Sequence, residues 1–467
     1  MNTIKTLAQK YLFSGKAFYA QLLTLALPII IQNFIGSSLN MVDTVMIGRL
    51  GETEIAAVGL ANQFFLLFIL IINGIHSGCG VFIAQFWGQG EKESIKKVLG
   101  LGLLAAVVVS LLFTIVALFY PESIVNIFNK DPQVIREGAV YLKVVSLSYV
   151  LTAISIGFGM ASRSIGNTVL PMVVSALALG CNTFLNYVLI FGHFGAPQLG
   201  VEGAAIATAI ARLVEMLVMV TLIYVRSDVL RVRLRDLVGI SSEYVEKVFK
   251  TILPVVLNEG CWGLAFVVYS GVYGHISTQA FAAIQITNTI QNLFTVAIFG
   301  MASASAVMVG HKIGEGNEEE GEVYAWRFSA LSWLSGLLIG ALMAVSTPAI
   351  LSLFNVSTAV YNSALRIQYI TSLIMVIRVF NIVQIVGVLR GGGDVRFSLA
   401  AEATTMWCIG VPLAFFGAFT LRLPVEGVVA LVMFEEVAKF TAIIFRLISR
   451  RWIKNLVHGM VLCEEQG

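Results

Sequence analysis

The stretch "LPIIIQNFIGSSLNMVDTVMIGRLG" (residues 27–51) is apolar over most of its length, yet it contains Asp43. The apolar run begins around Leu22 and is longer than the roughly 20 residues that a helix needs to cross the hydrocarbon core of a bilayer. A charged side chain inside such a helix costs about 3 kcal/mol and usually faces a cavity or a partner. The stretch therefore predicts a membrane helix that carries an ionisable group.

The composition predicts that the whole chain lies in a membrane. Its 467 residues are 58% hydrophobic and only 12% charged, whereas soluble domains contain about 25% charged residues. Repeated apolar runs predict an all-α integral membrane protein with twelve spans. We expect the first run to be a span and not a cleaved signal peptide. The predicted spans are 20–47, 56–84, 98–119, 139–161, 169–191, 202–225, 251–273, 281–308, 328–353, 367–389, 397–421 and 425–448.

The positions of the basic residues predict the orientation. If both termini lie inside, most of the 30 Lys and Arg residues fall on that side, including those of the segment 226–250. Cytoplasmic loops are enriched in Lys and Arg. We therefore expect a multi-pass protein of the cell (inner or plasma) membrane with both termini in the cytoplasm.

The sequence repeats itself at a shift of about 226 positions. "LPIIIQNF" (27–34) matches "LPVVLNEG" (253–260), and "GQGEKE" (88–93) matches "GEGNEE" (314–319). Each half holds six predicted spans, so both halves enter the membrane in the same direction, as in some transporters. We predict an N-lobe (1–236) and a C-lobe (237–467), pseudo-symmetric and six helices each. Pro28 and Pro254 match early in spans 1 and 7, where each is expected to kink its helix.

Two carboxylates stand out inside the spans, one in each half. Asp43 matches Tyr269 of the other half, and Glu259 matches Asn33. Each half thus has a carboxylate where the other has a neutral polar group, which favours function over a shared structural need. A carboxylate withdrawn from water favours its protonated form, so either group could exchange H⁺, or bind Na⁺ with neighbouring oxygens. The alternative is a structural carboxylate neutralised by a neighbouring donor.

Asn182 and Asn186 lie one turn apart on span 5 and therefore share a face. They could bond to another helix, or they could line an ion site with Asp43, to which Thr208 would also contribute. Weaker candidates for the substrate cavity are polar residues whose default role is contact between helices. They are Gln32, Asn33, Asn62, Tyr269, Gln285, Asn288, Arg378 and Asn381.

The remaining charges inside spans have structural interpretations. Arg212/Glu215 and Glu436/Lys439 are spaced i,i+3, which predicts ion pairs along one helix. Arg378 and Glu402 have no partner close in sequence; Arg378 could pair with a carboxylate across the cavity.

The motifs of other protein classes are absent from the sequence. There is no GK[ST] phosphate loop, HExxH, CxxC or GxSxG, and Cys79, Cys181, Cys261, Cys408 and Cys463 show no paired spacing. We expect no enzyme activity, no cofactor, no catalytic residue and no nucleic-acid partner. A metal would enter only as Na⁺ at Asp43 or Glu259.

The chain resembles the multidrug and toxic compound extrusion (MATE) transporters. The resemblance covers essentially the whole chain and is carried by residues 27–51, "AQFWGQGE" (84–91), "NTFLNYVLIFG" (182–192) and "VEGAAIAT" (201–208), with the repeat. It implies a V-shaped two-lobe fold and an antiporter that exports organic cations against Na⁺ or H⁺. Asp43 and Glu259 then match the family's carboxylates of spans 1 and 7. Two departures are Asn186 and Asn381, which stand where some members have an aspartate.

The leading hypothesis is therefore a monomeric secondary antiporter for amphipathic or cationic drugs in the lipid bilayer, with alternating access of two lobes. The alternative is a flippase for lipid-linked oligosaccharides, or another lipid flippase of the same superfamily. A pyrophosphate-binding cavity should be cationic, but carboxylates outnumber basic groups in the span interiors. The carboxylates are Asp43, Glu215, Glu259, Glu402, Glu435 and Glu436; the basic groups are Arg212, Arg378 and Lys439.

Overall fold

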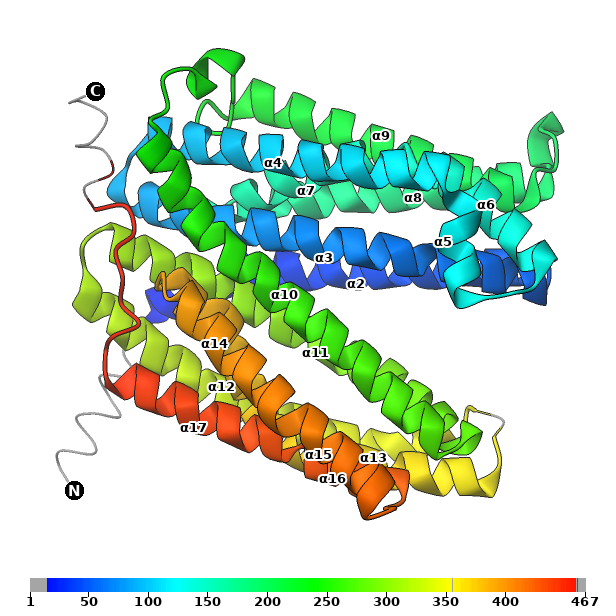
Figure 1. Cartoon of the computed structure of the whole chain (residues 1–467). Coiled ribbons are helices and arrows are strands. Elements are labelled where there is room, and N and C mark those ends of the chain that lie inside the picture. The colour runs from blue at the N-terminus through cyan, green and yellow to red at the C-terminus, as the bar shows by residue number, and fades with distance from the viewer. Residues whose placement is uncertain (1–14, 355, 459, 461–467) are drawn as a thin grey trace. The chain divides into compact units, whose positions relative to one another are not determined.

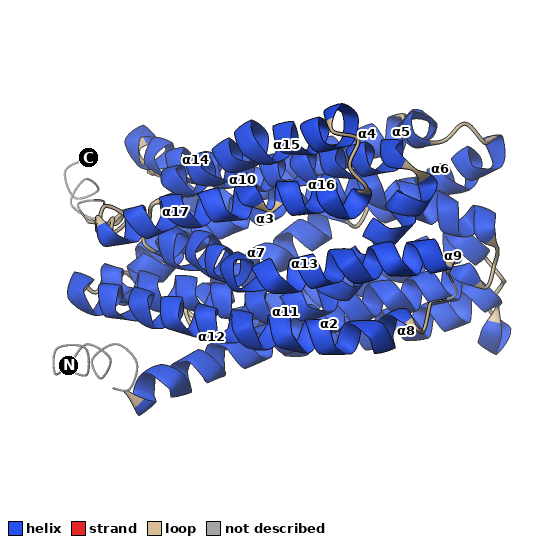
Figure 2. Cartoon of the chain, turned by 90° about the horizontal axis from the view of Figure 1, so that it is seen from below, coloured by secondary structure: helices blue, strands red, loops and turns tan. Residues whose placement is uncertain are grey.

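The computed structural model describes residues 15–354, 356–458 and 460, and no strand occurs among them (Figures 1 and 2). Cys463 lies outside these residues. The first half contains α2 (Lys16–Gly48), α3 (Glu52–Gln89), α4 (Lys92–Phe119), α5 (Pro121–Phe128), α6 (Pro132–Ser146), α7 (Tyr149–Ser164), α8 (Val169–Phe191), η2 (His193–Gly195), α9 (Gly200–Arg226) and η3 (Leu234–Leu237). The second half contains α10 (Ser242–Ile276), α11 (Thr278–Gly314), α12 (Glu318–Leu351), α13 (Thr358–Ile382), η4 (Val383–Leu389), α14 (Val395–Thr405), η5 (Met406–Gly410), α15 (Val411–Phe415), η6 (Phe416–Thr420), α16 (Val425–Val432) and α17 (Phe434–Ile448).

All twelve predicted spans fall on helices. Within the described part of the chain, ten helical segments are long and apolar enough to cross a membrane, and α6 with α7 forms an eleventh that is bent by 50°. The twelfth predicted span, 425–448, corresponds to α16 and α17. It is not among those segments because it is divided into two short helices, of 8 and 15 residues, and because it contains Glu426, Glu435, Glu436 and Lys439.

The described helices pack as two compact units. One contains residues 27–256, and the other contains residues 15–26 together with Leu257–His458. The chain therefore changes unit inside α2 and again inside α10, in each case within three residues of the matching prolines Pro28 and Pro254. The predicted lobe boundary at 236/237 falls within η3, in the connection that leads into α10, and stays a prediction.

Short turns with defined chemistry join the long helices. Gly90 (φ 86°) and Gly316 (φ 78°) both adopt the left-handed conformation, which glycine accepts without a steric penalty. They occupy the repeated "GQGE" and "GEGN" sequences. Asn317 then caps α12, since its Oδ1 accepts a hydrogen bond from the backbone N–H of Glu320 at 3.1 Å. The repeat therefore specifies the same turn in both halves.

Candidate functional site

Asp43 takes part in a chain of hydrogen bonds that joins three helices. Its Oδ1 accepts a hydrogen bond from Nδ2 of Asn186 on α8 at 2.6 Å. The same Nδ2 donates to Oδ1 of Asn182, one turn earlier, at 2.9 Å. Asn182 in turn donates from Nδ2 to Oγ1 of Thr208 on α9 at 3.3 Å. The prediction that both amides share a face is confirmed, and they bond to other helices and to Asp43 at once.

The amides of this chain are held rigidly. Asn182 and Asn186 are each 1% exposed, whereas Asp43 is half-buried. Asn186 Oδ1 is buried and has no hydrogen-bond partner among the described residues. A buried carbonyl oxygen without a donor costs about 1–3 kcal/mol. This oxygen, next to the Asp43 carboxylate, therefore suits a proton donor or a small cation.

Tyr141 and Arg212 complete this cluster, although no sequence pattern places them beside Asp43. Tyr141 on α6 is 6% exposed, hydrogen-bonds to Thr208 and interacts electrostatically with Asp43. Arg212 forms the predicted ion pair with Glu215, at 2.7 Å, and also interacts with Asp43. A tyrosine near the start of a predicted span carries no distinctive signal. We call Asp43, Tyr141, Asn182, Asn186, Thr208 and Arg212 the Asp43 cluster.

Glu259 on α10 has a different kind of partner. Its Oε1 lies 2.8 Å from Nη1 of Arg390, whose side chain is only 5% exposed. Arg390 Nη2 also donates to Oδ1 of Asn258, and Asn258 Nδ2 donates to Oε2 of Glu402 at 2.8 Å. Glu259 is thus paired with a cation supplied by the protein.

Arg390 stands at the end of a helix, directly before the turn that contains Gly392 and Gly393. The helical backbone continues from α13 through the π-helical η4 to Arg390, whose side chain is buried. A π-helical segment shifts the face that each later residue presents, so α-helical periodicity alone does not predict which groups Arg390 meets.

The two repeats contain the same arginine–amide chain. Arg163 donates to Oε1 of Gln32 at 2.7 Å, and Gln32 donates from Nε2 to Ser175 at 2.8 Å. These residues correspond in sequence to Arg390, Asn258 and Glu402. The C-terminal copy, however, has Glu402 in place of Ser175 and Glu259 in place of Asn33. The repeat therefore preserves the scaffold, and the carboxylates are what distinguish the two copies.

The other predicted cavity residues fall into two groups. Three of them make polar contacts with another helix. Tyr269 contacts Glu435 of α17 at 2.5 Å, and Asn381 contacts Glu436 of α17 at 2.7 Å. Arg378 contacts Gln291 of α11 at 2.9 Å. The remaining residues are accessible on the surface of their own unit: Asn33 and Asn288 are half-buried, and Asn62 and Gln285 are exposed.

One detail of the charge pairing differs from the prediction. Lys439 lies 3.3 Å from Glu435 but 3.9 Å from Glu436, so the predicted i,i+3 pair is the looser of its two contacts. Glu435 is one turn away along α17, which brings it closer. Arg378 does have a carboxylate on another helix, since its Nε lies 3.9 Å from Glu436.

Asp394 is a further deeply buried carboxylate of the second half, and its charge is already balanced. Its side chain is 0% exposed, and it lies 2.6 Å from both Arg446 and Lys454. These contacts attach the start of α14 to the end of α17 and to the segment that follows it. Two basic groups on one carboxylate make it unsuitable for binding a further cation.

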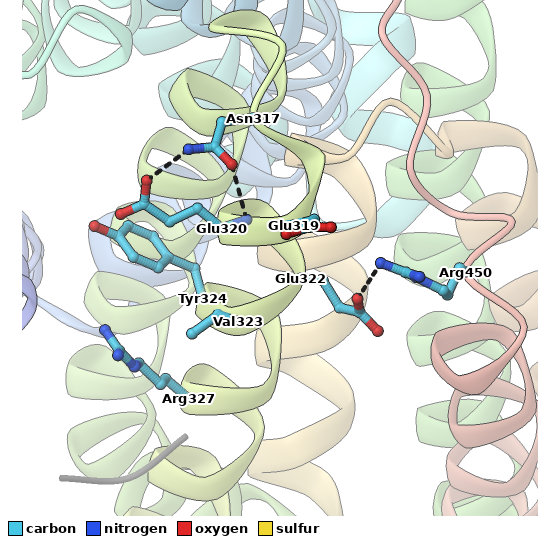
Figure 3. Close-up of a pocket in the computed structure, with 8 residues that line it drawn as sticks. All are labelled: Asn317, Glu319, Glu320, Glu322, Val323, Tyr324, Arg327 and Arg450. Carbon is cyan, nitrogen blue, oxygen red and sulfur yellow. Dashed lines mark hydrogen bonds and ion pairs between the residues drawn. The ribbon is translucent and has the colours of Figure 1, made fainter. Parts of the chain in front are cut away.

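A polar pocket at the start of α12 contains none of the predicted site residues (Figure 3). In Figure 3 Asn317 points to Glu320, and Glu322 pairs with Arg450. Arg327 lies over the Phe18 ring, 5.2 Å from its centroid. The pocket therefore marks where the beginning of α2 and the end of α17 are fixed to α12.

Two further expectations concern metals and cysteines. Among the described residues, no group of three or more His, Cys, Asp or Glu side chains is arranged to hold a metal ion. Cys79, Cys181, Cys261 and Cys408 are free thiols.

Comparison with known proteins gives matches along the whole chain. A family model described as MatE matches residues 28–188 and again 254–416, once in each half. An uncharacterized transporter, YisQ of Bacillus subtilis, is 25% identical over 436 residues and covers 93% of this chain and 95% of its own. The probable multidrug resistance protein NorM of Thermotoga maritima is 24% identical and covers 96% of both chains.

A third relative and a solved structure agree with these matches. The multidrug resistance protein MdtK of Yersinia pseudotuberculosis is 26% identical over 97% of this chain and 99% of its own. The outward-facing structure of a multidrug resistance MATE family transporter superposes with a TM-score of 0.84 at 21% identity, over 92% of this chain and 96% of that one. At this identity the structural match shows the fold.

Proposed function

The chain belongs to the MatE family of multidrug efflux transporters, and on this premise we propose that it is a secondary antiporter that couples export to ion entry at Asp43. It exports amphipathic or cationic compounds in exchange for H⁺ or Na⁺ by alternating access of two lobes. The ion gradient supplies the work, since one elementary charge that crosses 100 mV yields about 2.3 kcal/mol.

The hydrogen-bonded chain from Asp43 to Thr208 is the observation that carries this proposal. It places a half-buried carboxylate beside the buried, unpartnered Oδ1 of Asn186. Asp43 and Glu215 share the single cation Arg212, so a proton on Asp43, or a Na⁺ ion shared by these oxygens, removes one excess negative charge. A binding preference of a few kcal/mol for one lobe arrangement is sufficient to shift a two-state equilibrium strongly.

Glu259 takes a secondary part in this proposal. An ion from solution must compete with Arg390, which already lies 2.8 Å from the Glu259 carboxylate. We therefore assign the coupling ion to Asp43, with Asn182, Asn186 and Thr208 as its oxygen-bearing neighbours. The accessible amides Asn33, Asn62, Gln285 and Asn288 are assigned to contacts with the transported compound.

The cellular setting follows from the basic residues of the sequence. We assign the chain to the cell membrane with both termini in the cytoplasm, because the Lys- and Arg-rich connections then lie inside. Our proposal treats the chain as a monomer.

The test is efflux of a fluorescent organic cation, ethidium, from proteoliposomes under an imposed H⁺ or Na⁺ gradient. We expect one gradient to drive efflux by the unmodified protein, and Asp43→Asn to abolish it while the variant stays folded. Glu259→Gln is the matched variant and should retain part of the activity.

If Asp43→Asn pumps normally, Asp43 is structural. If neither gradient moves the dye, the flippase hypothesis becomes the better one, and reconstitution with a fluorescent lipid-linked oligosaccharide tests it.

A further inference from the structure

The segment 425–448 contains more buried charge than any other predicted span. Glu435 and Lys439 on α17 are 5% and 4% exposed, and the Glu436 side chain is 14% exposed. Ionisable residues within membrane spans are rare and mark ion pathways or sites more often than they serve packing. The repeat accounts for a charged pair at Glu436 and Lys439, but neither the repeat nor the proposed role of Asp43 explains Glu435.

These charges meet groups from two other helices. Lys439 Nζ lies between the two carboxylates, 3.3 Å from Glu435 Oε1 and 3.9 Å from Glu436 Oε2. The Tyr269 hydroxyl on α10 donates to Glu435 Oε2 at 2.5 Å. Asn381 on α13 donates from Nδ2 to Glu436 Oε2 at 2.7 Å. We call these five residues the α17 cluster; a single ammonium serves two carboxylates in it.

Asn381 supplies a second, independent observation. It is 1% exposed, and its Oδ1 is buried with no hydrogen-bond partner among the described residues. Its Nδ2 donates to Glu436 Oε2, so the unpartnered Oδ1 of the same amide group lies near that carboxylate. An acceptor in this position requires a donor, such as a protonated carboxyl or a displaced ammonium.

The α17 cluster corresponds to the Asp43 cluster in the repeat. Tyr269 is the counterpart of Asp43, and Glu436 and Lys439 are the counterparts of Arg212 and Glu215. Both clusters contain a buried asparagine whose Oδ1 has no partner in the described structure, Asn186 in one and Asn381 in the other. The carboxylate of the Asp43 cluster is on α2, the first helix of its half, whereas the carboxylates of the α17 cluster are on the last helix of the other half.

We propose that the α17 cluster is a second proton-exchange site, in which Glu435 takes up a proton and Lys439 moves from Glu435 to Glu436. The proton comes from the solution on one side of the membrane, converts the Glu435 carboxylate to the carboxylic acid, and leaves to the other side. A proton is favoured over a metal cation because the Lys439 ammonium already occupies the space between the carboxylates and repels a second cation. The inference rests on the proposed antiport, to which it adds a second coupling group.

The charged and titratable groups around Glu435 are consistent with one exchangeable proton. Arg378 lies 3.9 Å from Glu436, and Tyr273 and Glu402 interact electrostatically with Glu435 and Lys439 respectively. The negative charge of three carboxylates, Glu402, Glu435 and Glu436, thus exceeds the positive charge of the two cations Arg378 and Lys439 by one. One proton balances this charge.

The first test does not depend on transport. Infrared difference spectra between mildly acidic and mildly alkaline buffer, recorded on the full-length protein in lipid vesicles, detect the carbonyl stretch of protonated carboxyl groups. We expect Glu435→Gln to remove one such band and Asp43→Asn to remove another. Glu426→Gln is the matched control, because Glu426 pairs with the exposed Arg366 at 3.0 Å, and it should change neither band.

The outcomes separate this inference from the proposed function. An unchanged spectrum in Glu435→Gln overturns the inference, even if the protein pumps dye. A Glu435 band that responds to Na⁺ at constant pH also overturns it, because the site then binds a metal cation. A lost band, together with about half as many protons exchanged per ethidium, supports it. If Glu435→Gln does not fold, Glu435→Gln/Lys439→Met removes one charge of each sign and repeats the test.

Discussion

Asp43 and Glu259 are equivalent as single residues, and their partners distinguish them. Asp43 is bonded to a neutral amide, whereas Glu259 is bonded to Arg390. Sequence patterns identified both carboxylates and the Asn182–Asn186 face, because these signals are local. Arg390 and Tyr141 were not predicted as partners, since they lie about 100 or more residues away from the carboxylates they approach, and helical periodicity does not specify which helices are neighbours.

The Glu259–Arg390 pair leads to a prediction about stability. Arg390→Met leaves a carboxylate without its counter-ion in the interior, and removing one partner of a buried pair costs about 3–5 kcal/mol. The double variant Arg390→Met/Glu259→Gln should recover most of this loss, because it removes both charges. The measurement is thermal unfolding of the purified variants in detergent.

Arg163→Met is the matched control for this comparison. Arg163 is the repeat counterpart of Arg390 and donates to the neutral Gln32 at 2.7 Å, so its removal leaves no unpaired charge. It should destabilise less than Arg390→Met. Equal losses in the two single variants, with no recovery in the double variant, would show that the Glu259 charge is unimportant.

Asn186 provides a prediction about the Asp43 cluster itself. Asn186→Leu removes the amide that donates to Asp43 at 2.6 Å, and a hydrogen bond to a charged group contributes about 1.5–3 kcal/mol. We expect ion-driven ethidium efflux to fall about tenfold or more. Tyr187→Phe, one residue further along α8, should pump normally because Tyr187 stacks on His193 and is exposed. Normal pumping by Asn186→Leu would remove Asn186 from the proposed site.

At the scale of the elements, the helices were predictable and their irregularities were not. Runs of apolar residues specify where a span begins and ends to within several residues, because lipid tolerates no unpaired backbone. The bend between α6 and α7 and the π-helical segments η4 to η6 depend on packing against neighbours. The last span shows the same limit, since its buried charges are tolerated only with Tyr269 and Asn381 beside them.

Close helix packing predicts a site that is sensitive to added volume. A Cβ atom at Gly340 of α12 would lie 2.5 Å from the backbone oxygen of Ser372 on α13. Gly340→Ala should therefore destabilise the protein by about 1–3 kcal/mol through overpacking. Gly271→Ala on α10 meets nothing within 4 Å, so it should be neutral or slightly stabilising, as alanine is the better helix former. Thermal unfolding distinguishes the two; a Gly340→Ala variant as stable as Gly271→Ala would contradict this packing.

At the scale of the whole molecule, the repeat explains both what is shared and what differs. The arginine–amide chains and the glycine turns occur in both halves, whereas the carboxylates lie at different positions in each. The chain also changes unit within α2 and α10, next to Pro28 and Pro254. Sequence comparison reveals the repeat, but the exchange of helix ends between units depends on packing that no local pattern encodes.

The predicted orientation can be tested directly. Green fluorescent protein fused after Gly467 should fluoresce in the cytoplasm, and alkaline phosphatase at the same position should be inactive, because it folds only outside the cytoplasm. Both fusions can be compared with fusions in the connection after α8, which the same topology places outside. An active phosphatase at Gly467 would reverse the orientation of every span.

The most direct test of the central claim is the affinity of the purified protein for ethidium, measured by fluorescence as pH and Na⁺ concentration are varied. Antiport through one carboxylate requires that the ion and the drug weaken each other's binding, by roughly 5–150-fold for typical coupling. We predict that ethidium affinity falls as the coupling ion is raised in the unmodified protein, and that Asp43→Asn binds ethidium with little dependence on that ion. Two results would contradict the assignment of coupling to Asp43. One is an ethidium affinity of the unmodified protein that depends on neither pH nor Na⁺ concentration. The other is an ethidium affinity of Asp43→Asn that keeps the full ion dependence of the unmodified protein.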